Sequence, residues 1–307
     1  MILAAGMTPA WQQILVFDRV RMGEVNRASA AHCCASGKVL NVGIALHHLG
    51  VSARTLSAGG GWSLAAMTAD LQQLGVACRW VPTAGPTRVC TTILESCTRM
   101  TTELVENSVE FSTTELAQFQ HAYLEEAAAA EVVVISGSLP AVTHETYFRD
   151  LVARTPGRVV LDVRGAELLA ALPARPFLVK PNRSELSQTF KRDLSRDADL
   201  QTAMLDLNER GARWVVITDG PQAVWVSSAS QVWKLQPPLI NVVNPIGSGD
   251  ALAAGVAAAL DAGVEVLEAV RYGMASAADN ATQLLPCRLD PQRVQDLQTQ
   301  VTVNQAN

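Results

Sequence analysis

A glycine-rich turn that ends in an acid offers the clearest chemistry in this sequence, at residues 244–250 (Asn-Pro-Ile-Gly-Ser-Gly-Asp). We call it the anion loop, and we expect a helix of small residues to follow it at 251–255. Small residues at the start of a helix let backbone N–H groups converge on an anion, and the helix dipole adds partial positive charge. Asp250 could then take a proton from an attacking hydroxyl while the amides hold phosphoryl oxygens. Taken alone, the loop also fits a simple turn with Asp250 as a helix cap.

The elements that must position this loop are short β-branched runs that alternate with helical patterns, for example at 132–135, 159–161 and 214–217. This alternation predicts a parallel sheet covered by helices. Ligands of such sheets bind at the carboxyl ends of the strands. Residues that directly follow these runs are therefore candidates for the site.

Residues 14–17 and 88–105 show a different residue pattern, because Thr, Val and Leu alternate there without an intervening helix. They are expected to form antiparallel strands outside the main sheet. We predict a β-lid from about 10–30 and 85–107, within a single domain that spans 1–307.

Composition excludes several functional classes. The 307 residues are 49% hydrophobic and carry a formal net charge of -5 without a basic block, so no nucleic-acid partner is expected. The start of the chain lacks a basic region typical of a signal peptide, and the longest small-apolar run, 251–260, is about half of a membrane span. The six cysteines fit neither a disulfide framework nor a zinc site. A cytoplasmic protein without a membrane partner is predicted.

The anion loop resembles the C-terminal signature of the ribokinase and phosphofructokinase-B (PfkB) family of carbohydrate kinases. Further stretches resemble, in the same order, motifs of its 1-phosphofructokinase and tagatose-6-phosphate kinase branch; they are 23–27 (Gly-Glu-Val-Asn-Arg), 36–42 (Ser-Gly-Lys-Val-Leu-Asn-Val), 87–88 (Thr-Arg), 136–140 (Ser-Gly-Ser-Leu-Pro) and 180–186 (Lys-Pro-Asn-Arg-Ser-Glu-Leu). The resemblance implies a ribokinase-like three-layer α/β/α fold with a doubly wound, mostly parallel sheet and a small β-sheet lid. It also implies an ATP- and Mg²⁺-dependent kinase that phosphorylates a ketose phosphate.

The same resemblance implies the catalytic and cofactor residues. Asp250 would be the base, and Lys180 would lie near the transferred group. The backbone amides of the anion hole would come from Gly247, Ser248 and Gly249. Asn182 and Glu185 would hold hydrated Mg²⁺ near the phosphates. The nucleotide side would include Asn182, Thr218, Gly220 and Asn280, the last in a helix that lines the adenine pocket.

Substrate binding is implied for Gln12, Arg27, Gly37, Lys38, Asn41, Arg88 and Ser138. Three of them, Arg27, Lys38 and Arg88, are candidates to clamp the phosphate that the sugar already carries, since guanidinium groups grip phosphate oxygens in pairs. Asn41 and Ser138 would bind sugar hydroxyls.

This sequence departs from the family pattern on the acceptor side. Gln12 stands where relatives have a carboxylate that grips sugar hydroxyls, and charge-assisted hydrogen bonds are about twice as strong as neutral ones. Ser36, Val39 and Leu64 replace glycines. The phosphoryl-transfer half keeps its pattern, which favours retained chemistry on an altered acceptor.

Three functions stay open from the sequence. The first is a kinase of fructose 1-phosphate or, second, of tagatose 6-phosphate. The others are a non-catalytic sugar- or nucleotide-binding protein of the same fold, and a kinase of an unphosphorylated sugar or nucleoside. A homodimer through the lid is implied by the resemblance alone, and the sequence does not define the sugar, the nucleotide preference or the oligomer.

Overall fold

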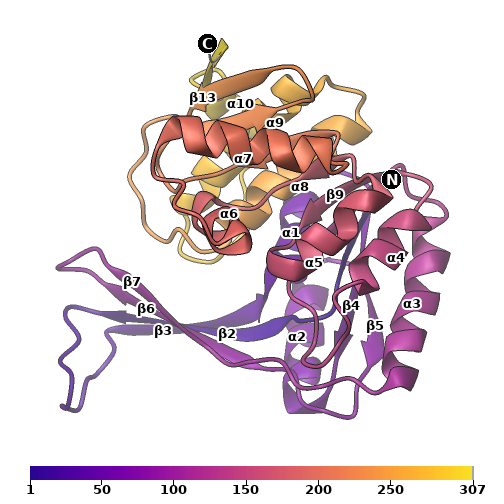
Figure 1. Ribbon diagram of the computed structural model, residues 1–307. Coiled ribbons are helices and arrows are strands. Elements are labelled where there is room, and N and C mark those ends of the chain that lie inside the picture. Colours follow the sequence, from indigo (N-terminus) through magenta and orange to yellow (C-terminus); the bar gives the residue numbers. More distant parts are fainter. Residues whose placement is uncertain (306–307) are drawn as a thin grey trace.

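Residues 1–305 are described by the computed structural model, and they form two β-sheets with helices packed around the larger one (Figure 1). Within these residues the larger sheet has ten strands, in the order β14-β13-β12-β11-β10-β9-β8-β1-β4-β5. They are β1 (Ile2–Gly6), β4 (Ala53–Gly59), β5 (Cys78–Pro82), β8 (Val132–Ser136), β9 (Arg158–Asp162), β10 (Leu178–Val179), β11 (Trp214–Ile217), β12 (Val224–Ser227), β13 (Val232–Gln236) and β14 (Thr302–Gln305). Pairing is parallel from β5 to β11 and antiparallel from β11 to β14, which confirms the predicted mostly parallel sheet.

Helices cover both faces of this sheet. Ile2 and Ala4 of β1 belong to one apolar core, and Leu3 and Ala5 belong to another. The first core is covered by α1 (Lys38–His48), α2 (Gly61–Leu74), α8 (Ser248–Asp261), α9 (Val266–Ala281) and α10 (Pro291–Gln298). The second is covered by α3 (Thr113–Ala127), α4 (Tyr147–Ala153), α5 (Gly165–Ala171), η1 (Leu172–Ala174), α6 (Arg183–Phe190) and α7 (Asp197–Glu209). The three-layer arrangement is confirmed, and it explains why the β1 and β8 side chains are buried on both faces.

The smaller sheet, which we call the lid, projects to one side of the main body (Figure 1). It has the order β3-β2-β6-β7, with β2 (Ala10–Phe17), β3 (Ala30–Ser36), β6 (Val89–Glu95) and β7 (Thr101–Val105). The expected antiparallel strands outside the main sheet are confirmed in the pairs β2–β3 and β6–β7, whereas β2 and β6 pair in parallel. Each of them leaves the main body outward, and β3 and β7 return antiparallel beside them.

Close helix packing holds the C-terminal half of the site. A Cβ at Gly255 of α8 would lie 2.5 Å from Oγ of Ser276 and 2.8 Å from Cα of Gly273, both on α9. The small residues that follow the anion loop therefore let α8 and α9 pack closely. Among residues 1–305, no helix combines the length and the apolar character that a membrane crossing requires.

Candidate active site

The anion loop leads directly into α8, as the small residues predicted. Gly247 is the N-cap with φ 83°, and a Cβ there would lie 2.9 Å from Cβ of Pro286, so both the backbone and the space require glycine. The first-turn amides of α8, including that of Gly249, have no acceptor within the helix. The amide of Ser248 instead donates to the carbonyl of Pro245 at 3.1 Å. Of the three amides expected in the anion hole, that of Ser248 thus stabilises the turn itself.

Asp250 lies in the first turn of α8, buried with 6% exposure. Its Oδ2 accepts a hydrogen bond of 2.7 Å from Nδ2 of Asn41 on α1. Burial raises the pKa of Asp250 to about 7, and the nearby Lys38 and Lys180 ammonium groups oppose this rise. A carboxylate with such a pKa exchanges protons near neutral pH, which suits a general base.

Two lysines share one carboxylate beside the base. Oδ1 of Asp162 lies 3.3 Å from Nζ of Lys180 and 3.2 Å from Nζ of Lys38. Burial would raise the pKa of Asp162, but the two ammonium groups outweigh it and hold the pKa below its usual range. A Cβ at Gly249 would lie 3.4 Å from Nζ of Lys180, so this ammonium group lies against the anion loop. Sequence reasoning missed Asp162, although it directly follows the predicted run 159–161 at the carboxyl end of β9.

Asn182 and Glu185 form a capping box at the start of α6. Oδ1 of Asn182 accepts from the amide of Glu185 at 2.8 Å, and Oε2 of Glu185 accepts from the amide of Asn182 at 2.9 Å. Oε1 of Glu185 faces Nζ of Lys38 at 3.7 Å. In residues 1–305 no cluster of three His, Cys, Asp or Glu side chains could bind a metal directly. Since Glu185 is the one carboxylate of the pair, the residues fit Mg²⁺ only when the ion keeps its waters and contacts Oε1 through them.

On the acceptor side, Gln12, Gly37 and Ser138 lie near the junction of the lid with the main body. Gln12 is buried with 3% exposure, and its Nε2 donates to Oγ1 of Thr92 at 2.8 Å, so the side chain is held within the lid. Oγ of Ser138 is exposed and lies 3.2 Å from Oγ1 of Thr8. Gly37 precedes α1 with φ 89°, where a Cβ would lie 2.9 Å from Cα of Pro9.

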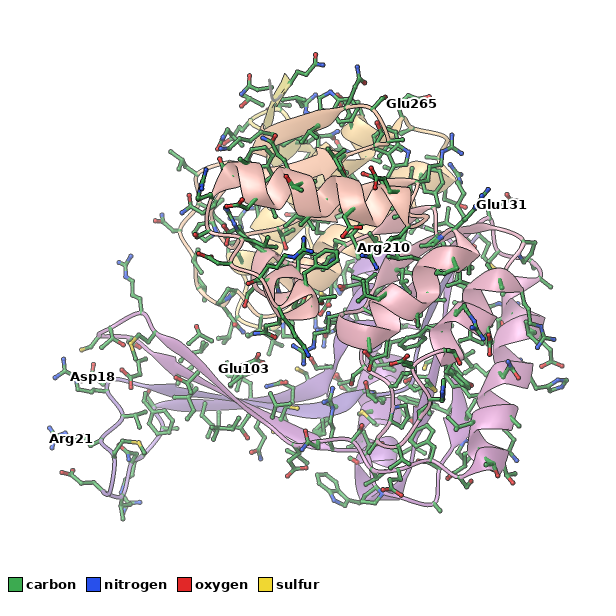
Figure 2. The ribbon with its side chains drawn as sticks, viewed as in Figure 1. Asp18, Arg21, Glu103, Glu131, Arg210 and Glu265 are labelled. Carbon is green, nitrogen blue, oxygen red and sulfur yellow. The ribbon has the colours of Figure 1, made fainter. Side chains whose placement is uncertain are left out.

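The three cations expected at one phosphate do not converge within the chain. Arg27 is exposed in the loop between β2 and β3, whose first part, at Asp18 and Arg21, lies at the far end of the lid (Figure 2). Arg88 donates to the carbonyls of Thr8, Pro9 and Glu106 at 3.0–3.4 Å, which joins the lid to the main body. Lys38 faces carboxylates beside the base. One chain by itself therefore does not gather the three cations, because Arg27 lies in the lid loop, and the phosphate clamp stays a prediction.

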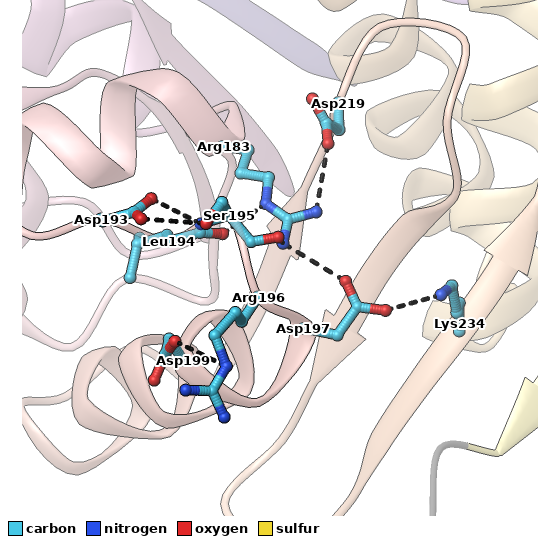
Figure 3. A network of polar contacts seen from close by, with 9 residues as sticks. All are labelled: Arg183, Asp193, Leu194, Ser195, Arg196, Asp197, Asp199, Asp219 and Lys234. Carbon is cyan, nitrogen blue, oxygen red and sulfur yellow. Dashed lines mark hydrogen bonds and ion pairs between the residues drawn. The ribbon is translucent and has the colours of Figure 1, made fainter.

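The turn at Thr218 and Gly220 is attached to the start of α6. The amide of Arg183 donates to the carbonyl of Thr218 at 2.8 Å, and the Arg183 guanidinium group donates to Oδ2 of Asp219 at 3.2 Å. Figure 3 shows this group also joined to Asp197, which in turn pairs with Lys234. Gly220 has φ 54°, with open space where a side chain would be.

Asn280 contacts the anion loop. It is fully buried, and its Nδ2 donates to Oγ of Ser248 at 2.9 Å and to the carbonyl of Ile246 at 3.0 Å. Its Oδ1 accepts from the amide of Cys287 at 2.6 Å. The side chain therefore stabilises the anion loop, and the adenine-side role that the resemblance implied stays a prediction.

Residues 12–291 match the model of the pfkB family carbohydrate kinases. The chain belongs to the pfkB family. Its structure is similar to that of phosphofructokinase-2 from Escherichia coli in complex with substrates and products, with a TM-score of 0.87, 25% identity, and coverage of 96% of this chain and 98% of that one. It is also similar to a possible 1-phosphofructokinase from Thermotoga maritima, with a TM-score of 0.91, 21% identity, and coverage of 100% and 99%. A ribokinase from Arabidopsis thaliana matches with a TM-score of 0.76 at 18% identity, covering 97% and 98%.

Membership of the pfkB family agrees with the resemblance read from the motifs, and the ribokinase-like fold is confirmed. The site combines a buried acid, an amide-lined loop and a pair of lysines. These groups lie at or beyond the carboxyl ends of β9 and β10, or at the starts of α1 and α8.

Proposed function

We propose that this pfkB-family kinase transfers the γ-phosphoryl group of ATP to a hydroxyl of a ketose phosphate. Fructose 1-phosphate is the first choice of acceptor and tagatose 6-phosphate the second. The observation that carries the proposal is the buried Asp250 carboxylate, with a pKa of about 7, at the head of an amide-lined loop. Phosphoryl transfer needs positioning and charge stabilisation more than covalent help, and this site offers both.

In this mechanism Asp250 accepts the proton of the acceptor hydroxyl. Asn41 holds Oδ2, which leaves Oδ1 to face the substrate. The first-turn amides of α8 and Nζ of Lys180 stabilise the charge on the transferring phosphoryl group. Mg²⁺, held through water by Glu185, would neutralise phosphate charge when it arrives with ATP. Proton transfer would therefore depend on Asp250 alone, whereas charge stabilisation would combine the amides of segment 247–250 with Lys180.

A phosphorylated acceptor is supported by the similar solved structures. The Escherichia coli phosphofructokinase-2 has also been solved in complex with fructose-6-phosphate, so this hexose phosphate belongs in the test. Arg88 and Lys38 could contact a substrate phosphate only in exchange for the carbonyl and carboxylate partners that they have within the chain. Gln12, fixed to Thr92, offers a neutral amide to the sugar, so selectivity among ketoses should differ from that of relatives with a carboxylate.

A homodimer through the lid would bring Arg27 to a partner subunit's site. The lid also exposes Leu104 and Val105 of β7, which are 56% and 57% accessible. The Escherichia coli neighbour is known in a tetrameric inhibited form. Light scattering on the purified protein and on a Leu104→Glu, Val105→Glu variant tests this proposal, since a dimer through the lid should become a monomer.

The activity is tested by coupled ADP release over a panel of ketose phosphates, free sugars and nucleosides. We expect turnover on a phosphorylated ketose that falls by about three orders of magnitude or more in Asp250→Asn, because both proton transfer and loop geometry are affected. Preference for an unphosphorylated acceptor would move the assignment to a free-sugar kinase. Absence of turnover on the whole panel, together with measurable ATP binding, would instead identify a binding protein.

A further inference from the structure

The hydroxyl of Ser36 lies two hydrogen bonds away from the proposed base. Oγ of Ser36 donates to Oδ1 of Asn41 at 3.0 Å, and Nδ2 of Asn41 donates to Oδ2 of Asp250 at 2.7 Å. The three side chains come from β3 of the lid, from α1 and from α8. Their exposures are 1%, 3% and 6%, so water has little access to replace either bond.

The chemistry of the three side chains determines which group donates and which accepts in each of the two hydrogen bonds. An ionised carboxylate only accepts hydrogen bonds, so the NH₂ end of the Asn41 amide must face Asp250. The oxygen end then faces Ser36, whose hydroxyl can donate to it. Without that hydroxyl, a buried carbonyl oxygen would lose its partner, and the amide would turn to find another.

We propose that Ser36 is a positioning residue for the base, because its hydroxyl orients the Asn41 amide so that the amide holds the Asp250 carboxylate toward the acceptor. This inference rests on the kinase function proposed above. Since Ser36 is the last residue of β3, the lid and the base are joined through one side chain. At this position the family pattern has glycine, which has no hydroxyl to offer.

The pKa of Asp250 should change when the hydrogen bonds from Ser36 through Asn41 are disturbed. Lys38 from α1 and Lys180 after β10 favour its charged form, whereas Asp162 at the end of β9 opposes it. Burial raises the pKa of the neighbouring Cys287 thiol well above its usual value, so that group stays neutral. The hydrogen bond from Asn41 lowers the pKa of Asp250. Loss of that bond must therefore raise the pKa, and the base then needs a higher pH to ionise.

The experiment compares Ser36→Ala with Ser276→Ala. Ser276 is also fully buried, and its hydroxyl donates to the carbonyl of Tyr272 at 2.9 Å, so the control removes a similar group away from the base. In Ser36→Ala we expect the acid limb of the kcat/KM profile to move up by about one pH unit, kcat at pH 7 to fall about fivefold, and KM for ATP to stay unchanged. In an Asn41→Ala background, Ser36→Ala should have no further effect. A loss of activity equal at all pH values, or equal in the Ser276 control, would overturn the proposal.

A second measurement does not require turnover. The ¹³C carboxyl resonance of labelled Asp250, identified by its loss in Asp250→Asn, is titrated in the wild type, in Ser36→Ala and in Ser36→Gly. Its midpoint should rise in both Ser36 variants and stay unchanged in Ser276→Ala. Unchanged midpoints in the Ser36 variants would refute the positioning role even in a fully active kinase. Shifted midpoints in a protein that phosphorylates nothing would refute the proposed function and leave the positioning role supported.

Discussion

Removal of the Asp162 charge tests how much the ion pairs of this buried carboxylate with Lys38 and Lys180 contribute to the stability of the folded protein. In Asp162→Asn, Lys180 keeps 4% exposure and loses its partner at 3.3 Å, whereas Lys38 is 35% exposed and can reach water. Breaking a buried pair costs about 3–5 kcal/mol, and a partly exposed pair adds about 0–1 kcal/mol. We therefore expect the free energy of unfolding to fall by about 3–5 kcal/mol, a large part of the roughly 5–15 kcal/mol typical of folded proteins.

Urea denaturation followed by circular dichroism measures this loss. The control is Glu268→Gln, which removes an exposed ion pair of 2.9 Å with Arg271 and should change the free energy of unfolding by less than about 1 kcal/mol. The double variant Asp162→Asn, Lys180→Met should be more stable than Asp162→Asn, because it leaves no unpaired buried charge. The reasoning would be refuted if Asp162→Asn had the same free energy of unfolding as Glu268→Gln. It would also be refuted if the double variant were no more stable than Asp162→Asn.

The same prediction has a pH dependence of known sign. The pKa of Asp162 is lowered in the folded protein, so its contribution is present above the unfolded value of about 3.9 and is lost as the pH falls through the folded pKa. The difference in stability between the wild type and Asp162→Asn should therefore narrow in acid. A difference that widens below about pH 4 would contradict the ion-pair explanation.

Three further variants test the supports of the site. Gly247→Ala should lower kcat and cost about 1–3 kcal/mol of unfolding free energy, since its φ is 83° and Pro286 lies 2.9 Å from the added Cβ. Arg183→Met should raise KM for ATP more than it changes kcat, because the guanidinium group attaches the 218–220 turn to α6. Initial rates measured over a range of ATP concentrations test this expectation. In Asp70→Ala, the amide of Ala35, which donates to Oδ2 of Asp70 at 2.8 Å, should exchange hydrogen faster in mass spectrometry, while amides in β8 keep their protection.

Much of the main sheet and its helices could be predicted, because short local patterns of residue types determine these elements. The β-branched runs at 132–135, 159–161 and 214–217 are strands of the main sheet, and the Gly-Ser-Gly-Asp turn does open a helix. The direction of the lid strands was not predictable, since the alternation of residues along β2 and β6 is the same for either orientation. That direction depends on how the chain passes through the main body between them.

The candidate site was predictable in its residues and less so in its contacts. Asp250 and Lys180 lie at the loop as expected. Asn280 and Asn41 were assigned to ligands, yet their amides bind the loop and the base, because a buried amide takes the nearest partner the fold provides. Asp162 carried no motif, and only its place after a strand indicated it.

The close contact between α8 and α9 bears on which part of the protein can move during a reaction. Gly255 packs so closely on α9 that an added Cβ would overlap Ser276 and Gly273, so we expect the helix that carries the acid to keep its place in the main body. Any closure around a bound sugar must then be performed by the lid, which approaches a stationary carboxylate. Substitutions that alter the speed of opening should therefore map to residues 10–36 and 88–105, and not to the C-terminal helices.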